Sequence, residues 1–182
     1  SDAARPGMDA VIELKRAARE SIQPSVVKWL EELEDRGTAR EMEEYLSAEV
    51  EHLDGVDVRT EASHAAGLEH ISARIRELVA LEGCVPLPDA KEEHHKMRIA
   101  AKHLRYSAEA FRPLFDDKLK DEIATLKGLQ DLLGEMHDCD VWMSAEGDLT
   151  CQLCSVPGAQ EGVSALMRDR RKRRGQRYRS FA

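Results

Sequence analysis

Residues 93–106, EHHKMRIAAKHLRY, gather three histidines and four cationic side chains into fourteen positions of a chain whose net charge is −8. Because a helix advances about 100° per residue, this spacing gives the segment two different faces. The cationic face, which Lys91 joins one turn earlier, carries His95, Arg98, Lys102 and Arg105. The opposite face is apolar and carries Met97, Ala100, Ala101, Leu104, Ala108 and Phe111. The segment is therefore predicted to be an amphipathic helix with one face in a core and the other presenting cations.

The rest of the chain predicts helices and essentially no strands, because apolar residues recur every three or four positions. Pro24 is expected to start or kink a helix, and Thr38–Glu41 and Asp89–Glu92 are read as capping boxes. One apolar face of residues 63–81 carries Leu68, Ile71, Ile75 and Leu78. Besides the helix that begins near residue 91 and ends before Pro113, helices are expected over residues 8–21, 24–37, 38–53, 63–81, 117–143 and 159–180, with a loop over 144–158.

These segments predict an all-α protein, an antiparallel bundle or bundles of about six to seven helices. Residues 1–7 are expected to be a tag or disordered, residues 8–58 to form N-terminal helices, and residues 59–182 to form the bundle. Apolar runs fall well short of the ~20 residues that span a bilayer. Four cysteines are too few to suggest a disulfide scaffold, so the expected location is a reducing cytoplasm.

A second polar stripe is predicted on the helix over 117–143, whose core face carries Leu126, Leu129, Leu133 and Met136. This stripe carries Lys127, Gln130, Gly134 and His137. The link to the first cationic helix is short, so the two helices are expected to be antiparallel neighbours. Asp140 points toward the core side, where it needs a partner. Asp138 could orient His137 or hold Arg98 or Arg105 as a fork.

Two spaced motifs resemble the CHAD domain, an α-helical family named for its histidines. The first, within 91–112, is His95-x-x-Arg98-x-x-x-Lys102-x-Leu104-Arg105-Tyr106. The second, within 123–143, is Leu126-Lys127-x-Leu129-Gln130-x-Leu132-Leu133-Gly134-x-x-His137-Asp138-x-Asp140-Val141. The family usually carries such motifs twice and this chain carries them once, so the chain is expected to be a shortened member or a fragment. Self-association into a homodimer is one way to complete its groove.

The resemblance implies a CHAD-like helical fold and non-catalytic binding of inorganic polyphosphate in a basic groove. It also implies association with polyphosphate granules, and some family members are fused to a triphosphate-processing enzyme domain. Neither a cofactor nor a metal is implied. By position, the phosphate-facing residues are His95, Arg98, Lys102, Arg105, Lys127 and His137. Lys91, Tyr106, Gln130 and Asp138 are assigned supporting roles.

Other functions remain open on the sequence. The cationic stripe lacks interleaved aromatic residues, which favours polyphosphate over a nucleic acid. His137, Cys139, Cys151 and Cys154 could hold zinc, and a phosphohydrolase could use His95, His137, Glu93 and Asp138. A structural or interaction bundle with a salt-bridged surface would bind no ligand.

The C-terminal end of the chain is strongly basic. Eight cations against Asp169 give residues 166–182 a net charge of +7, and the rest of the chain carries −15. Such an asymmetry suggests an anionic partner for one surface. Four of these arginines share a helix face and would either extend the groove or lie on a frayed tail: Arg170, Arg173, Arg174 and Arg177.

Overall fold

The structure, a computed structural model, describes residues 4–52, 55–57, 59–116 and 118–182. These residues form seven α-helices and contain no strand, which confirms the all-α prediction. The helices are α1 (Arg5–Asp35), α2 (Thr38–His52), α3 (Glu61–Val79), α4 (Lys91–Phe111), α5 (Lys120–Ser144), α6 (Glu146–Gln152) and α7 (Ala159–Phe181). Two short 3₁₀ turns, η2 (Glu82–Cys84) and η3 (Arg112–Phe115), lie before and after α4.

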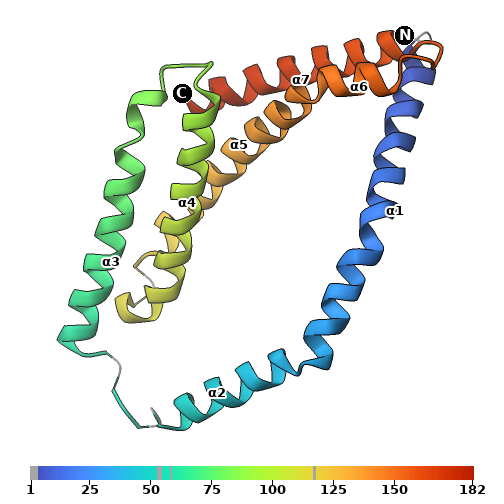
Figure 1. The fold of residues 1–182 in the computed structure, drawn as a ribbon. Helices are drawn as coiled ribbons and strands as arrows, with labels where there is room; N and C mark the ends of the chain where they lie inside the picture. The colour runs from blue at the N-terminus through green and yellow to red at the C-terminus, as the bar shows by residue number, and fades with distance from the viewer. Residues whose placement is uncertain (1–3, 53–54, 58, 117) are drawn as a thin grey trace.

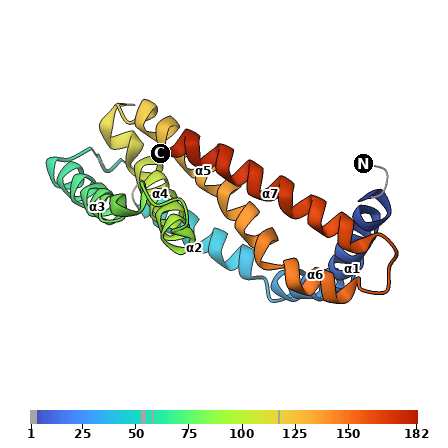
Figure 2. The ribbon, with the colours of Figure 1, turned by 90° about the horizontal axis from the view of Figure 1, so that it is seen from above.

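The helices α4 and α5 form the centre of the body and run antiparallel, as the short link between them predicted (Figure 1). α3 packs on α4, and α7 returns along α5 (Figure 2). The apolar face predicted for α4 is confirmed, because Met97, Ala100, Ala101, Leu104 and Ala108 are all buried. Met97 meets Leu133 and Met136 of α5 in a core that Tyr178 and Phe181 of α7 close on one side.

A second core joins α1, α6 and α7 at the other end of the body. Val11, Leu149, Leu153, Val163 and Met167 are buried there. α6 lies within residues 144–158, where a loop was predicted, and that prediction is wrong. The sequence feature that could have indicated α6 is the spacing of Leu149 and Leu153, because two residues four positions apart lie on the same side of a helix and here both face this core.

Residues 4–7 belong to this packed end, although a tag or disorder was expected there; residues 1–3 lie outside the described residues. Ala4 and Gly7 are buried. A Cβ added to Gly162 of α7 would lie 2.6 Å from the Cα of Gly7. The two helices therefore cross with their backbones in contact, which requires glycine at this point.

The first helix continues through Pro24, so the two helices predicted over 8–21 and 24–37 are one. Proline removes one backbone hydrogen bond from a helix. The residues around Pro24 are all exposed, and the carbonyl that loses its partner stays hydrated. The helix therefore tolerates the proline without ending.

The second half of α1 and all of α2 turn away from the body. We call residues 18–52 the arm. In Figure 1 α1 runs down from its contact with α7, and α2 returns toward α3. No residue of the arm is buried, although it carries many apolar side chains. The expected boundary between residues 58 and 59 falls after the arm; Leu53, residue 54 and residue 58 lie outside the described residues.

Two predicted capping boxes are corrected, and the apolar face of α3 is only partly covered. α2 begins at Thr38 itself, and the N–H of Glu41 donates to the carbonyl of Gly37 rather than to the Thr38 side chain. α4 has no side-chain cap, so Asp89 does not form a capping box. On α3, Leu68 and Ile75 are exposed because α4 and η3 cover only the side that carries Ile71.

Candidate anion-binding site

The two polar stripes predicted on neighbouring helices meet at a pair of histidines. His95 of α4 and His137 of α5 stack with ring centroids 4.1 Å apart and ring planes 29° apart. The heptad-like apolar faces of α4 and α5 hold the helices side by side and fix the rings at their border. Two imidazoles in contact cannot both be charged cheaply without an anion nearby.

Arg98 lies one turn after His95 and crosses α5 at Gly134. A Cβ added to Gly134 would lie 3.6 Å from Nε of Arg98, so the absent side chain leaves room for the guanidinium. Among the described residues, Nε of Arg98 and Nδ1 of His95 are buried without a hydrogen-bond partner, as is Nε of Arg170 on α7. Because buried polar atoms are nearly always paired, the two atoms one turn apart on α4 mark a place where a ligand oxygen would be accommodated.

Lys102 and Lys127 continue the cationic face along α4 and α5. Among the described residues, neither lysine nor Arg98 forms an ion pair. Lys127 is exposed and Lys102 is half-buried. The two lysines and Arg98 therefore carry charge that the protein itself does not neutralise.

Arg105, at the far end of the stripe, is already bound within the protein. Its Nε donates to Oε1 of Gln130 at 2.9 Å, and a second nitrogen donates to Oε1 of Glu109 at 2.6 Å. Its guanidinium also lies over the ring of Tyr106, 4.4 Å from the centroid. Gln130 and Tyr106 thus support Arg105, and Glu109 offsets its charge.

The surroundings of His95 lower the pKa of its imidazole. Burial is the largest cause, followed by the charges of His137, Arg98 and Lys102. Each of these effects opposes the protonated form. His95 is therefore set to gain a proton when negative charge arrives beside it.

A cavity of ≈ 690 Å³ opens beside the histidine pair, between the start of α4 and the end of α5. Its polar lining includes the cations Lys91, Lys96 and Arg171, the two histidines, and the acids Glu92 and Asp140. Lys91 is partly offset by Asp140, whose Oδ1 lies 3.7 Å from its Nζ. Lys96 and Arg171 were not predicted, since Lys96 lies off the stripe in projection and Arg171 comes from a helix distant in sequence.

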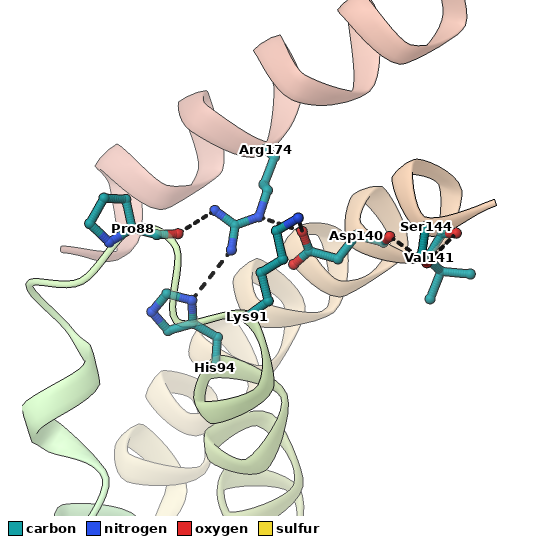
Figure 3. A network of polar contacts seen from close by, with 7 residues as sticks. All are labelled: Pro88, Lys91, His94, Asp140, Val141, Ser144 and Arg174. Atoms are coloured by element: carbon teal, nitrogen blue, oxygen red, sulfur yellow. Dashed lines mark hydrogen bonds and ion pairs between the residues drawn. The ribbon is translucent and has the colours of Figure 1, made fainter. Parts of the chain in front are cut away.

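The core partner that Asp140 required is Arg174 of α7 (Figure 3). Arg174 is buried, and its Nε donates to Oδ1 of Asp140 at 2.7 Å. A second nitrogen donates to the carbonyl of Pro88 at 2.6 Å, and the third lies 3.5 Å from Nδ1 of His94. An arginine only donates, so Nδ1 of His94 accepts and its Nε2–H donates to the carbonyl of Cys84, 3.0 Å away.

His94 is therefore a core residue, enclosed by Tyr178 and Phe181, whereas its neighbour His95 faces the site. The sequence projection placed His94 only at the edge of the stripe. Its burial depends on α7, a helix that the projection of a single segment does not include.

The remaining C-terminal arginines do not extend the cationic stripe, and α7 is not a frayed tail. α7 packs along α5 and ends at Phe181. Arg173 and Arg177 both donate to Oε2 of Glu135, and Arg170 pairs with Asp169. Glu135 is held ionised by these contacts, because hydrogen bonds from Arg173 and Arg177 lower its pKa. Three acids from outside the segment, Glu135, Asp140 and Glu146, therefore offset part of its +7 charge.

The other predicted residues are separate from this site. Asp138 is exposed and, in the described part of the chain, forms no hydrogen bond or ion pair with His137, Arg98 or Arg105. Cys139 is buried in the core side of α5, while Cys151 and Cys154 are exposed near α6. Over the described residues, no group of three or more histidine, cysteine or acidic side chains is placed to hold a metal.

This arrangement defines a class of protein: an all-helical domain with a cationic face beside two stacked histidines. The sequence model of the CHAD domain matches residues 1–145, from the start of α1 to the end of α5. The chain belongs to the CHAD domain family. The match reaches well beyond the two motifs toward the N-terminus and leaves α6 and α7 outside. Searches of curated proteins and of solved structures gave no match. No helix in the described ranges has the length and apolar character needed to cross a bilayer.

Proposed function

We propose that this chain binds inorganic polyphosphate, or a similar phosphate-rich polyanion, on the cationic face of α4 and α5 without transforming it. One observation carries the proposal. Among the described residues, Arg98, Lys102 and Lys127 have no ion pair, whereas Arg173, Arg174 and Arg177 of the same chain are all paired with acids. Other cations without an ion pair in the described part of the chain, such as Lys172 and Arg179, lie on exposed positions of α7, whereas Arg98, Lys102 and Lys127 are also the cations that the family motifs place toward phosphate.

Phosphate chemistry matches the groups present. Arg98 can bind two phosphate oxygens as a fork, and Lys102 and Lys127 act as point charges along a flexible chain. A phosphate oxygen beside Arg98 would accept from its unpartnered Nε. Negative charge beside His95 favours its protonated form, which then donates as well.

The structure also bears on the choice between polyphosphate and a nucleic acid. Single-strand binding proteins stack bases on free aromatic faces. Tyr106 is the aromatic residue closest in sequence to the stripe, and one face of its ring is occupied by Arg105. The face of Tyr106 that Arg105 covers cannot stack on a base, which supports polyphosphate over a single-stranded nucleic acid.

The family resemblance further implies a cytoplasmic location at polyphosphate granules and cooperation with a triphosphate-processing enzyme. Both belong to the proposal. Under it, the chain contributes binding, and an enzyme acting on triphosphates contributes the chemistry.

The test is a double charge reversal, Arg98→Glu with Lys102→Glu, measured by fluorescence anisotropy with end-labelled long-chain polyphosphate over a series of salt concentrations. The wild type should bind with a steep salt dependence, since bound cations displace counterions. The variant should bind weakly, and the slope of log Kd against log salt should be shallower by roughly 1.5.

The matched control is Lys172→Glu with Arg179→Glu, which makes the same charge change at two exposed positions of α7. Equal loss in both variants would refute the site, because it would show that net charge alone governs binding. Unchanged binding of the α4 variant would refute it as well. Release of phosphate from polyphosphate with Mg²⁺ present would refute the non-catalytic part, and tighter binding of single-stranded RNA of equal length would refute the choice of ligand.

A further inference from the structure

Two of the four cysteines lie together at the end of α6, outside the anion-binding site. Cys151 is in the last turn of α6, and Cys154 follows two residues after that helix ends. Both residues are exposed and both thiols are free. Figure 1 places the turn between α6 and α7 at the end of the body that carries the start of α1. The pair is therefore open to small reagents in solution.

The backbone holds the two cysteines close to each other. The N–H of Cys154 donates to the carbonyl of Cys151 at 3.3 Å, and this bond closes a turn of four residues. The ends of such a turn have Cα atoms within about 7 Å of each other, and disulfides join Cα atoms about 4.4–6.8 Å apart. Positions three apart also lie on one side of a helical turn. A small adjustment of the turn is therefore enough to join the two thiols.

The residue between the two cysteines fixes which way the turn faces. Leu153 is 5% exposed and belongs to the core that joins α1, α6 and α7. Val156, just after the turn, packs against the same core, and its N–H donates to the carbonyl of Leu153 at 2.9 Å. The core thus holds the turn from the inside, and Cys151 and Cys154 remain on its outer side.

The other two cysteines have the opposite surroundings. Cys84 is 6% exposed and Cys139 is 1% exposed. Burial raises the pKa of each thiol, which keeps it protonated. Because the thiolate is the form that attacks disulfides and oxidants, these two residues are expected to be inert. The chain therefore contains two buried thiols against which the reaction of the exposed pair can be compared.

We propose that Cys151 and Cys154 are a modification site that forms a reversible disulfide with an oxidised low-molecular-weight thiol, such as glutathione disulfide, as the oxidant. One cysteine attacks a sulfur of the reagent, which gives a mixed disulfide and releases one reduced thiol. The second cysteine then attacks the mixed disulfide, closes the bond between the two residues and releases the other reduced thiol. The two thiol protons pass to the released thiols, and two electrons pass from the protein to the reagent.

The second step is favoured because the second thiol is tethered three residues away, and a tethered group has a far higher effective concentration than a free reagent. Thiols readily reduce a disulfide that is exposed to solvent, so the bond should open again when reduced thiol is in excess. A helix N-terminus activates a cysteine, whereas Cys151 lies at the C-terminal end of α6. The pair is therefore a site that is modified and not a catalyst of disulfide exchange.

Closing the bond should also stabilise the end of the body that holds α1, α6 and α7. A disulfide restricts the unfolded chain, and this gain is smaller for a shorter closed loop. For the four-residue turn it corresponds to a rise in Tm of roughly 2–6 °C. Neither the bond nor this effect depends on polyphosphate binding, because both involve α6 and the core around it.

The test is intact-mass spectrometry of the 182-residue chain after equilibration with mixtures of reduced and oxidised glutathione. Free thiols are then blocked with N-ethylmaleimide under denaturing conditions. The reduced chain should take up four blocking groups, one for each free cysteine. The oxidised chain should take up two, located on Cys84 and Cys139 by peptide mapping, and excess reduced glutathione should restore four. Thermal unfolding of the two forms measures the shift in Tm.

The matched variants are Cys151→Ser and Cys154→Ser, which change exposed positions and should fold as the wild type does. Each should stop at a mixed disulfide with one glutathione and show no rise in Tm. Two glutathione adducts on the wild type would overturn the proposal, since the thiols would then react separately. So would four free thiols under glutathione disulfide alone, a disulfide between two chains, or oxidation at Cys84 or Cys139. An unchanged Tm of the closed form would overturn the stabilising effect.

Discussion

Arg174→Met should destabilise the fold strongly, because it removes the partner of a nearly buried carboxylate. The Arg174 side chain is 8% exposed and that of Asp140 is 14% exposed. Removing one member of a buried ion pair costs about 3–5 kcal/mol, since the other charge stays in the interior unpaired. In the variant, Lys91 still lies 3.7 Å from Asp140 and offsets part of its negative charge, so a cost near the lower end of this range is expected. The carbonyl of Pro88 also loses its donor.

The assay is reversible urea unfolding followed by circular dichroism at pH 7, with thermal unfolding as a second measure. A loss of about 3 kcal/mol corresponds to a fall in Tm of roughly 6–12 °C for a chain of this length. The control is Arg171→Met on the same helix, whose ion pair with Glu146 is 2.6 Å long but exposed on both sides. An exposed pair contributes less than about 1 kcal/mol. Equal losses in the two variants would refute the reasoning, because burial would then not determine the cost.

Three further outcomes are expected. Polyphosphate affinity should rise as pH falls from 8 to 6, because burial and neighbouring cations keep the pKa of His95 low and bound phosphate raises it. Binding titrations at several pH values and fixed ionic strength measure this change. The variant His95→Gln should show a flatter dependence of affinity on pH. Gly162→Ala should lower the unfolding free energy by about 1–3 kcal/mol, because its methyl group would meet the backbone of Gly7, and unchanged urea curves would contradict that contact. Gly134→Ala should raise the unfolding free energy by about 0.5–1 kcal/mol, because the methyl group fits 3.6 Å from Arg98 and alanine favours a helix; a loss would mean that Arg98 needs more room.

Local periodicity predicted the elements that pack against near neighbours in sequence. The apolar face of α4 and the antiparallel pairing of α4 with α5 depend on residues within about two helices, and both were predicted. On the apolar face predicted for α3, Leu68 and Ile75 stay exposed, because α4 and η3 bury only part of that face. The signal was real, but the sequence of a single chain does not say how many helices surround it.

The site shows the same division. His95 and His137 were both predicted, and the helical phase of two adjacent segments sufficed to bring them together. The role of Arg174 was not predicted, because its partners Asp140, His94 and Pro88 lie 34, 80 and 86 residues away in the chain. A basic C-terminal segment looks the same in sequence whether its arginines face solvent or acids. Only the packing of α7 on α5 distinguishes the paired arginines from the unpaired Arg98.

Adjacent histidines illustrate how one helix separates support from binding. His94 is fixed by Arg174 and the carbonyl of Cys84, and that contact ties the start of α4 to α7. Because consecutive helix positions differ by about 100°, a rigid His94 sets the direction of His95 toward His137. The buried contacts of His94 thus orient the ring of His95 toward the proposed ligand, although His94 itself does not face that ligand. The repulsion between Arg98 and Lys102 on one face of α4 is therefore opposed by the packing of the opposite face in the core and by the contact of His94 with buried Arg174.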